Sequence, residues 1–274
     1  MVSWRFEAIG APWEIETENA LPQAVRDAVS DRIAAYDLAW SRFRADSVVT
    51  AIGRGEASAE DLPPEEREPL FALYDVLGPA TGGRLSLGAG AALARLGYGP
   101  PSAAIDVGAA GKGHLVDLVG DVLDAHGVDA WIVDASGDLR HRGRRDAGDG
   151  DRDAVGAFSR PIRVALEHPG DPSRAVGVVE LGDAALCASA VNRRRWIALD
   201  GTPVHHVVDA LTGLPTSDIV ATWALARTAL VADGAATALF FTAGLPAALG
   251  VEWVRITSDG RIQRSEQWPG EVYA

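Results

Sequence analysis

The stretch DVGAAGKGHLVD, residues 106–117, contains the only lysine of a chain that has 25 basic residues. Lys112 lies between Gly111 and Gly113. Glycines let a ligand approach the backbone, and a helix that begins after such a loop offers free N–H groups and the positive end of its dipole. An ammonium is a compact point charge that fits among phosphate oxygens, where a guanidinium is larger. The stretch therefore predicts a phosphate-binding loop; the alternative is a glycine turn required only by strand-to-helix packing.

Neither of two common phosphate-binding motifs fits this loop. A Walker loop requires a glycine five positions before Gly111, where the chain has Asp106, and a hydroxyl residue where it has Gly113. The dinucleotide fingerprint G-x-G-x-x-G is absent as well, because the glycines lie at positions 108, 111 and 113. The loop keeps the physical features of a phosphate site without either pattern.

A carboxylate and a hydroxyl lie four residues apart in the segment VADGAAT. In a helix, Asp233 and Thr237 project from the same face. Both are hard oxygen ligands, of the kind that Mg²⁺ takes together with substrate phosphates. The alternative is that Asp233 lies in the first turns of a helix and only complements its dipole.

Two adjacent histidines, His205 and His206, precede the segment VVDALTG. Because side chains alternate along a strand, we expect one of the two to face the interior. An inward histidine serves either as a general base or as a hydrogen-bonded core residue. The residues Ser136, Gly137 and Asp138 form a turn after an apolar strand, which by itself is ordinary turn chemistry.

The composition is that of a folded, acidic protein. Of the 274 residues, 47% are hydrophobic, which suits one large domain or two small ones with a core that needs no disulfides. The net charge of -13 argues against nucleic acid or an anionic membrane surface as the main partner. The single cysteine, Cys187, lies in an apolar run and predicts a small buried hydrophobe, with a reactive thiol as the alternative, in a protein of a reducing compartment. The start of the chain lacks the features of a signal peptide, and no apolar run reaches the roughly 20 residues of a membrane span, so we expect a cytoplasmic protein without membrane insertion.

The apolar periodicity predicts the elements that position these residues. A strand before the glycine loop and another after the following helix would form a parallel pair with a right-handed crossover. A loop or capped turn is predicted at 37–52, a surface loop at 55–69, and a charged, glycine-rich excursion at 140–160. The predicted strands are 11–17, 102–107, 130–136, 161–168, 175–181, 185–190, 194–200, 205–210 and 220–226, with a hairpin at 251–268. The predicted helices are 21–38, 69–83, 88–99, 114–127 and 228–244. This mixture predicts the α/β (α+β) class, with mixed sheets flanked by helices.

Taken in order, these segments resemble the ApbE family, the FAD:protein FMN transferases. The family pattern combines an S-R-[FY] stretch, a D-x-G-x-x-x-K-G loop, a G-G-D turn, a T-S-G segment, H-x-x-D-P-x-T-G-x-P and A-D-x-x-x-T. The chain has SRFRADS, DVGAAGKGHLVD, SGD, CASA, HVVDALTGLP and ADGAAT in the same order over nearly its whole length. The resemblance implies one ApbE-like domain over 1–274, with the active site in a cleft between two halves.

The resemblance also implies a chemistry. Such enzymes bind FAD and Mg²⁺, cleave the FAD pyrophosphate and attach FMN through a phosphoester bond to a Ser or Thr of a partner flavoprotein, releasing AMP. The acceptor of this chain would be cytoplasmic. Two alternatives are an FAD pyrophosphatase that gives FMN and AMP, and a non-catalytic flavin-binding module.

The site residues follow from the matched motifs. The resemblance implies that Asp233, the Thr237 hydroxyl and the Ala109 carbonyl hold the metal. His206 would act as the base on the acceptor hydroxyl, with Asp233 also in the catalytic set. The residues implied to contact FAD are Asp106, Lys112, Val207, Phe43 and Ser86.

Four segments depart from the family pattern. F-D-P-T is replaced at 85–88, T-S-G at 188–190 and G-G-D at 136–138, while Ala210 stands in place of a proline. The metal, lysine and histidine positions are intact, whereas part of the wall that contacts the flavin is changed. We therefore expect the departures to affect FAD affinity more than the chemistry.

Overall fold

The computed structural model describes residues 1–100, 105–143 and 161–273. Its helices are α1 (Gln23–Trp40), α2 (Val48–Gly53), α3 (Pro64–Ala80), α4 (Ala89–Arg95), α5 (Gly111–Ala125) and α6 (Ala229–Ala238), with short 3₁₀ helices at Ala59–Asp61 and Ala247–Leu249. Its strands are β1 (Val2–Ala8), β2 (Ala11–Thr17), β3 (Trp131–Asp134), β4 (Asp138–Arg142), β5 (Ile162–His168), β6 (Asp171–Leu181), β7 (Ala184–Ala190), β8 (Arg195–Ile197), β9 (Pro203–His205), β10 (Ile219–Ala226), β11 (Glu252–Thr257), β12 (Ile262–Arg264) and β13 (Glu271–Val272).

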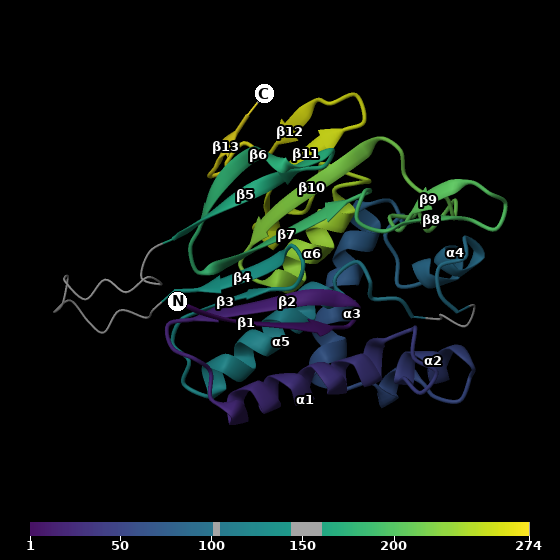
Figure 1. The fold of residues 1–274 in the computed structure, drawn as a ribbon. Coiled ribbons are helices and arrows are strands. Elements are labelled where there is room, and N and C mark those ends of the chain that lie inside the picture. The colour runs from purple at the N-terminus through teal and green to yellow at the C-terminus, as the bar shows by residue number, and fades with distance from the viewer. Residues whose placement is uncertain (101–104, 144–160, 274) are drawn as a thin grey trace.

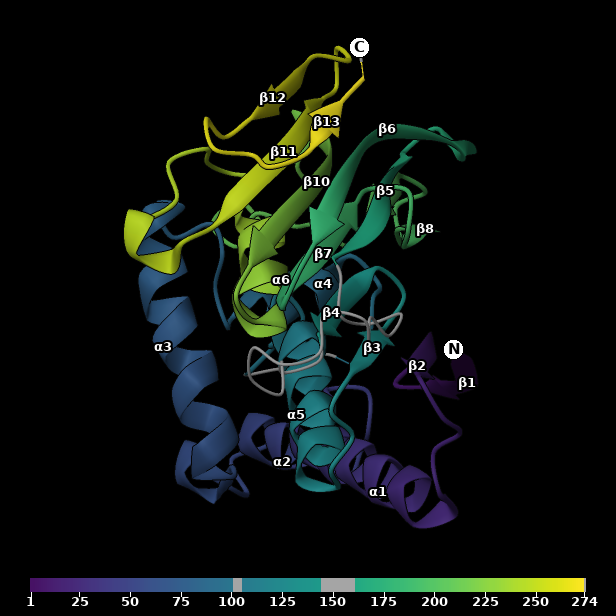
Figure 2. The same ribbon diagram turned by 90° about the vertical axis from the view of Figure 1, so that its left-hand side faces the viewer.

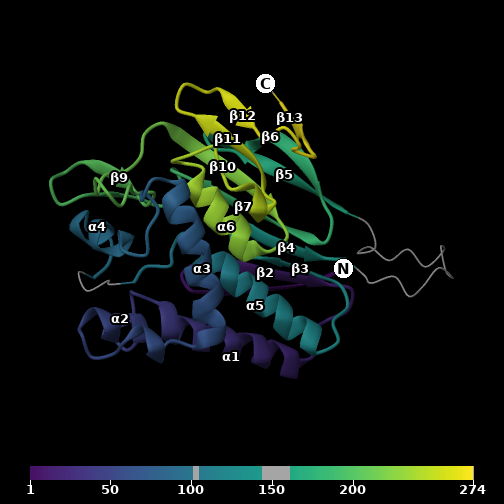
Figure 3. The ribbon, with the colours of Figure 1, turned by 180° about the vertical axis from the view of Figure 1, so that it is seen from behind.

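The strands form one large sheet and two small ones. Within the described ranges, the large sheet has eight strands in the order β1-β2-β3-β4-β7-β10-β11-β12. The small sheets are β13-β6-β5 and β8-β9. Each of these pairings is antiparallel. The fold is therefore α+β, with helices covering one face of the large sheet (Figures 1 and 3).

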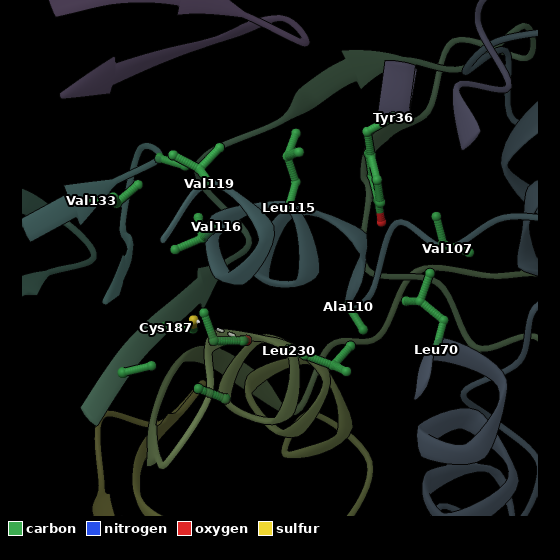
Figure 4. Packing of buried hydrophobic residues seen from close by; sticks show 14 of the residues in the cluster. Tyr36, Leu70, Val107, Ala110, Leu115, Val116, Val119, Val133, Cys187 and Leu230 are labelled. Carbon is green, nitrogen blue, oxygen red and sulfur yellow. Dashed lines mark hydrogen bonds between the residues drawn. The ribbon is translucent and has the colours of Figure 1, made fainter. Parts of the chain in front are cut away.

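Two hydrophobic clusters hold these layers together. In the first, Leu115, Val116 and Val119 of α5 pack with Val133 of β3 and Cys187 of β7 (Figure 4). Burying a side chain of this size contributes roughly 1.5–3 kcal/mol. The second cluster lies between the large sheet and the β13-β6-β5 sheet. Figure 2 shows the resulting layers from one side to the other: α3 and α6, then β10 and β7 of the large sheet, then β6 and β5.

Asp117 of α5 fixes the start of α6. Its two carboxylate oxygens accept hydrogen bonds from the backbone N–H groups of Ala229 (2.9 Å) and Leu230 (2.8 Å). Free N–H groups at a helix start are strong donors, and a buried carboxylate satisfies two of them here. Because α6 carries Asp233 and Thr237, this contact between α5 and α6 sets where those two side chains lie.

Most of the predicted elements are confirmed. The helices at 21–38 and 114–127 correspond to α1 and α5, and most of the predicted strands appear within a few residues of their expected bounds. Gly260 has a φ of 84°, as the turn of the predicted hairpin at 251–268 requires. Cys187 is fully buried, as predicted.

The predicted parallel unit is wrong. Of the predicted strand 102–107, residues 102–104 lie outside the described residues and 105–107 are not a strand, while β3 pairs antiparallel with β2 and β4. The hairpin β1–β2, whose first strand was not predicted, occupies the sheet position next to β3 that a parallel neighbour would need. Long-range strand order of this kind has no signal in local periodicity.

Several boundaries were also wrong. The segment at 37–52, predicted as a loop or capped turn, contains the end of α1 and the short helix α2, whose capping Ser47 side chain accepts a hydrogen bond from the Thr50 N–H. The predicted loop at 55–69 contains the first turns of α3, which begins at Pro64 with acidic residues favourable to a helix start. The strand at 205–210 ends already at His205, and the helix at 228–244 ends at Ala238. Of the excursion at 140–160, residues 140–142 belong to β4 and 144–160 lie outside the described residues.

No helix in the described part of the chain is long and apolar enough to cross a membrane.

Candidate active site

One large cavity, of about 1320 Å³, lies between the helices and the sheets. Its lining includes side chains of α1, α5, α6, β4, β5 and β7 and of the loops before α5 and after β9. All nine residues predicted for the site line it: Phe43, Ser86, Asp106, Ala109, Lys112, His206, Val207, Asp233 and Thr237. Drug-sized pockets measure roughly 300–1,000 Å³, so this cavity has room for a larger, dinucleotide-sized ligand.

Three oxygen atoms that could coordinate a metal lie where the glycine loop approaches α6. The Thr237 hydroxyl donates a hydrogen bond to the Ala109 carbonyl at 3.2 Å. Asp233 lies one helical turn before Thr237, and its Oδ2 accepts a hydrogen bond from the Gly113 N–H at 2.9 Å. The loop carbonyl, the hydroxyl and the carboxylate form a set of hard oxygen ligands suited to Mg²⁺.

Electrostatics favour a cation at this set. Burial, and next to it the charge of Asp138, raises the pKa of the Asp233 carboxyl well above its ordinary value, while Lys112 acts in the opposite direction. Taking a carboxylate out of water is costly unless a positive charge compensates, and a divalent cation would do so. Within the described residues, no cluster of three His, Cys, Asp or Glu side chains could hold a metal, and the set described here contains only one such side chain. The donors present therefore fit a metal that also takes ligands from its substrate.

Gly113 explains how α5 and α6 come close enough to build this set. A Cβ atom at this position would lie 2.1 Å from the Ala229 carbonyl oxygen and 2.6 Å from the Asp233 Cβ. Any side chain would therefore push the two helices apart. The second glycine of the sequence G-K-G serves helix packing as well as the loop.

Lys112 is held by three oxygens at the turn between β3 and β4. Its Nζ donates to the carbonyl of Ala135 at 2.6 Å and to that of Ser136 at 3.4 Å, and it forms an ion pair with Asp138 Oδ2 at 3.1 Å. Burial lowers the pKa of the ammonium, but the charges of Asp138 and Asp233 more than offset this and raise it above its ordinary value. A point charge with three donors matches this small nest, whereas a planar guanidinium would not.

Asp106 anchors the start of the glycine loop. Its Oδ1 accepts a hydrogen bond from the Gly108 N–H at 2.7 Å, and its Oδ2 pairs with Arg42 Nε at 2.8 Å. Both partners of this ion pair are buried. Because its two oxygens are occupied, Asp106 shapes the wall of the cavity through the loop and through Arg42.

His206 lines the cavity and His205 does not. The Nδ1 atom of His206 is buried without a hydrogen-bond partner among the described residues. Burial, followed by the charge of Arg194, lowers the pKa of His206 to about 4, so the ring is neutral at pH 7. His205 instead contacts the Thr216 carbonyl through Nε2 at 2.8 Å. One of the two histidines does face the cavity, as expected. Strand alternation does not explain this, because β9 ends at His205 and His206 lies after the strand.

Phe43 belongs to a group of aromatic side chains at the cavity. The motifs predicted Phe43 but not its neighbours Tyr98 and Trp196. The Arg42 guanidinium lies 4.4 Å from the ring centre of Phe43 and 5.1 Å from that of Tyr98. Tyr98 in turn stacks on Trp196 at 4.7 Å. Phe43 remains 56% exposed, so its ring can still cover a ligand. Ser86 and Val207 also line the cavity.

Sequence reasoning missed Arg42, Asp138 and Arg194 as cavity residues. Arg42 and Asp138 lie in the motif segments SRFRADS and SGD, so the sequence shows two charged side chains there but does not indicate which residues they contact. Arg194 carried no signal, because it comes from the edge of a short hairpin that reaches the cavity only in three dimensions.

Comparison with solved structures identifies the fold. The ApbE protein of Thermotoga maritima superposes with a TM-score of 0.81 over 98% of this chain and 99% of its own, at 19% identity. The flavin transferase ApbE of Vibrio cholerae gives 0.76 over 97% of each chain, at 21% identity. The fold is thus that of the ApbE flavin transferases.

Sequence comparison gives the family. The sequence model of the ApbE family matches residues 84–255. The chain belongs to the ApbE family. The FAD:protein FMN transferase of Vibrio cholerae serotype O1 is 32% identical over 141 residues, which are 51% of this chain and 39% of that protein. That of Escherichia coli strain K12 is 30% identical over 141 residues, or 51% of this chain and 37% of that protein. The matched regions thus span less than half the length of these curated relatives.

Proposed function

We propose that the chain is a Mg²⁺-dependent FAD:protein FMN transferase. It cleaves the FAD pyrophosphate and attaches FMN through a phosphoester bond to a Ser or Thr of a partner flavoprotein, releasing AMP. The observation that carries this proposal is the meeting of the Ala109 carbonyl, Asp233 and Thr237 in one cavity with His206 and Lys112. Family membership and the names of the curated relatives support it.

The residues of this chain divide the chemistry between them. In the transfer, the acceptor hydroxyl oxygen bonds to the FMN phosphorus, the phosphoanhydride bond breaks and AMP leaves with the bonding electron pair. Bound Mg²⁺, held by Asp233, Thr237 and the Ala109 carbonyl, would supply neutralisation of the phosphate charge. His206 is neutral at pH 7 and takes the hydroxyl proton. Phosphate charge close to the ring would raise its pKa and strengthen it as a base.

Lys112 is unsuited to the role of base. Its pKa is raised, so it stays protonated, and its three contacts hold the turn at Ser136 and Gly137 that lines the cavity. It therefore acts by shaping the cavity wall and by adding one fixed positive charge beside the pyrophosphate. The residues that hold ligand and metal are thus distinct from the residue that moves the proton.

The direct test is incubation with FAD and Mg²⁺, with and without a threonine-containing peptide. We expect AMP release and a peptide whose mass has increased by one FMN moiety, attached through its phosphate. AMP and FMN without labelled peptide would assign the chain to FAD hydrolysis. Bound flavin without cleavage would assign it to flavin binding alone.

A further inference from the structure

Four large apolar side chains are strongly exposed beside the cavity. Ile197, Leu199, Leu211 and Leu214 are 64%, 88%, 67% and 61% exposed. They lie on the β8–β9 hairpin and on the loop 208–214, and both segments pack against α4 or the turn that follows it. Exposed apolar residues that gather in one place typically mark a contact site.

The three segments form one unit. Trp196 of the hairpin donates from Nε1 to the Leu96 carbonyl after α4 at 2.6 Å, and Val208 packs with Ala92 and Leu93 of α4. A Cβ atom on Gly213 would lie 2.9 Å from a guanidinium nitrogen of Arg95. Figures 1 and 3 show the hairpin and α4 together at one end of the molecule.

This unit is basic on an acidic protein. Residues 89–98, 192–205 and 208–214 carry four arginines and two aspartates, whereas the chain has a net charge of -13. Arg95 and Arg195 are exposed, and neither forms an ion pair with a carboxylate of the described residues. Unpaired arginines next to exposed leucines favour a partner that is both acidic and apolar.

The exposed side chains border the cavity without lining it. Arg194 and Val208 line the cavity, while their neighbours Arg195 and Leu211 do not. A protein bound to the outer side chains would therefore place its own surface at the cavity mouth, next to His206.

We propose that Ile197, Leu199, Leu211, Leu214, Arg95 and Arg195 form a docking face for the acceptor protein, which binds through a segment carrying acidic and apolar side chains. This inference rests on the proposed function. A second copy of the chain is a poor occupant through the same face, because a two-fold contact would place arginines against arginines. The face thus selects the acceptor, and the cavity performs the transfer.

The test uses three fluorescein-labelled peptides of equal length, each with one central threonine. The first is rich in Asp and Leu, the second in Asn and Leu, so that it lacks the acidic side chains, and the third in Asp and Gln, so that it lacks the apolar ones. Their binding to the full chain without FAD is measured by fluorescence anisotropy. The test variant is Arg95→Glu with Arg195→Glu. The matched control is Arg174→Glu with Arg264→Glu, which changes the charge equally at two exposed arginines outside the cavity lining.

We expect the Asp/Leu peptide to bind tightest, and the test variant to lose about tenfold in its affinity while the control keeps it. The difference shrinks as salt is added. FAD affinity stays unchanged in both variants, because none of the four arginines lines the cavity. Selective peptide binding without FMN transfer by the unmodified chain would uphold the face and refute the proposed function.

Equal binding of the three peptides, or equal losses in test variant and control, would overturn the docking face. A dimer seen by sedimentation that Leu199→Asn with Leu211→Asn abolishes would overturn it too, since the face would then belong to a second copy of the chain.

Discussion

Replacing Gly113 by alanine tests whether the contact between α5 and α6 builds the metal set. The new Cβ atom would lie 2.1 Å from the Ala229 carbonyl oxygen, far inside van der Waals contact with backbone that cannot rotate away. Overpacking typically costs about 1–3 kcal/mol, and displacing the hydrogen bond from Gly113 to Asp233 adds roughly 1.5–3 kcal/mol. Alanine recovers up to about 1 kcal/mol of helix propensity. We therefore expect the free energy of unfolding to fall by about 2–5 kcal/mol.

Thermal and urea unfolding measure this effect, and FAD turnover at saturating Mg²⁺ measures its reach into the site. For a chain of this size the loss corresponds to a melting temperature lower by about 5–15 °C. The matched control is Gly182→Ala, because a Cβ atom at Gly182 meets no atom within 4 Å. A Gly113→Ala protein as stable and active as that control would refute the argument that close helix packing places Asp233.

Three further predictions concern single side chains. His206→Ala is expected to slow FMN transfer by roughly a hundred- to ten-thousand-fold with FAD affinity near normal, whereas His205→Ala should change the transfer rate little. Steady-state transfer rates and FAD titrations of both variants test this, and a larger loss of rate in His205→Ala would assign the base to His205 instead. Lys112→Ala is expected to weaken FAD binding strongly, and Lys112→Arg not to restore it because three oxygens surround Nζ; full rescue by arginine in a binding titration would contradict the need for a compact charge. Burial, then the charge of Arg32, lowers the pKa of His114 to about 4 in the folded chain. As the pH falls from about 6.5 to 4, the His114 ring is therefore protonated in the unfolded chain before it is in the folded chain, and the free energy of unfolding decreases. His114→Leu is therefore expected to reduce the acid-induced loss of unfolding free energy by up to about 3 kcal/mol, and urea melts at pH 7 and pH 4 that show the same loss in both proteins would count against this.

The local chemistry of the site could be predicted from the sequence because it depends on short spacings. Asp233 and Thr237 share a helix face by their separation of four, and Lys112 between two glycines indicates a loop that meets a helix start. The motif resemblance added which of these segments meet in space. The structure brings them to one cavity, with the Thr237 hydroxyl 3.2 Å from the Ala109 carbonyl.

The strand order could not be predicted in the same way. The residues before the glycine loop are apolar enough for a strand, yet β2 occupies the place beside β3 through pairs such as Ile15 with Val133. Likewise, nothing near Arg194 or Arg195 in the sequence indicates that the β8–β9 hairpin packs on α4 at the cavity mouth. Such contacts arise from tertiary packing between segments about 100 residues apart, as in the bond from Trp196 to Leu96.

The central claim is that this cavity cleaves FAD at a metal held by Asp233. Asp233→Asn keeps an oxygen that can accept the Gly113 N–H bond and removes only the buried charge, so the fold is expected to stay cooperative. The decisive measurement is AMP release from FAD across a Mg²⁺ titration, for the unmodified chain and for this variant. We predict turnover that saturates with Mg²⁺ and stops with a chelator in the unmodified chain, and no Mg²⁺-dependent turnover in the variant. Equal AMP release by the two proteins at every Mg²⁺ concentration would contradict the account.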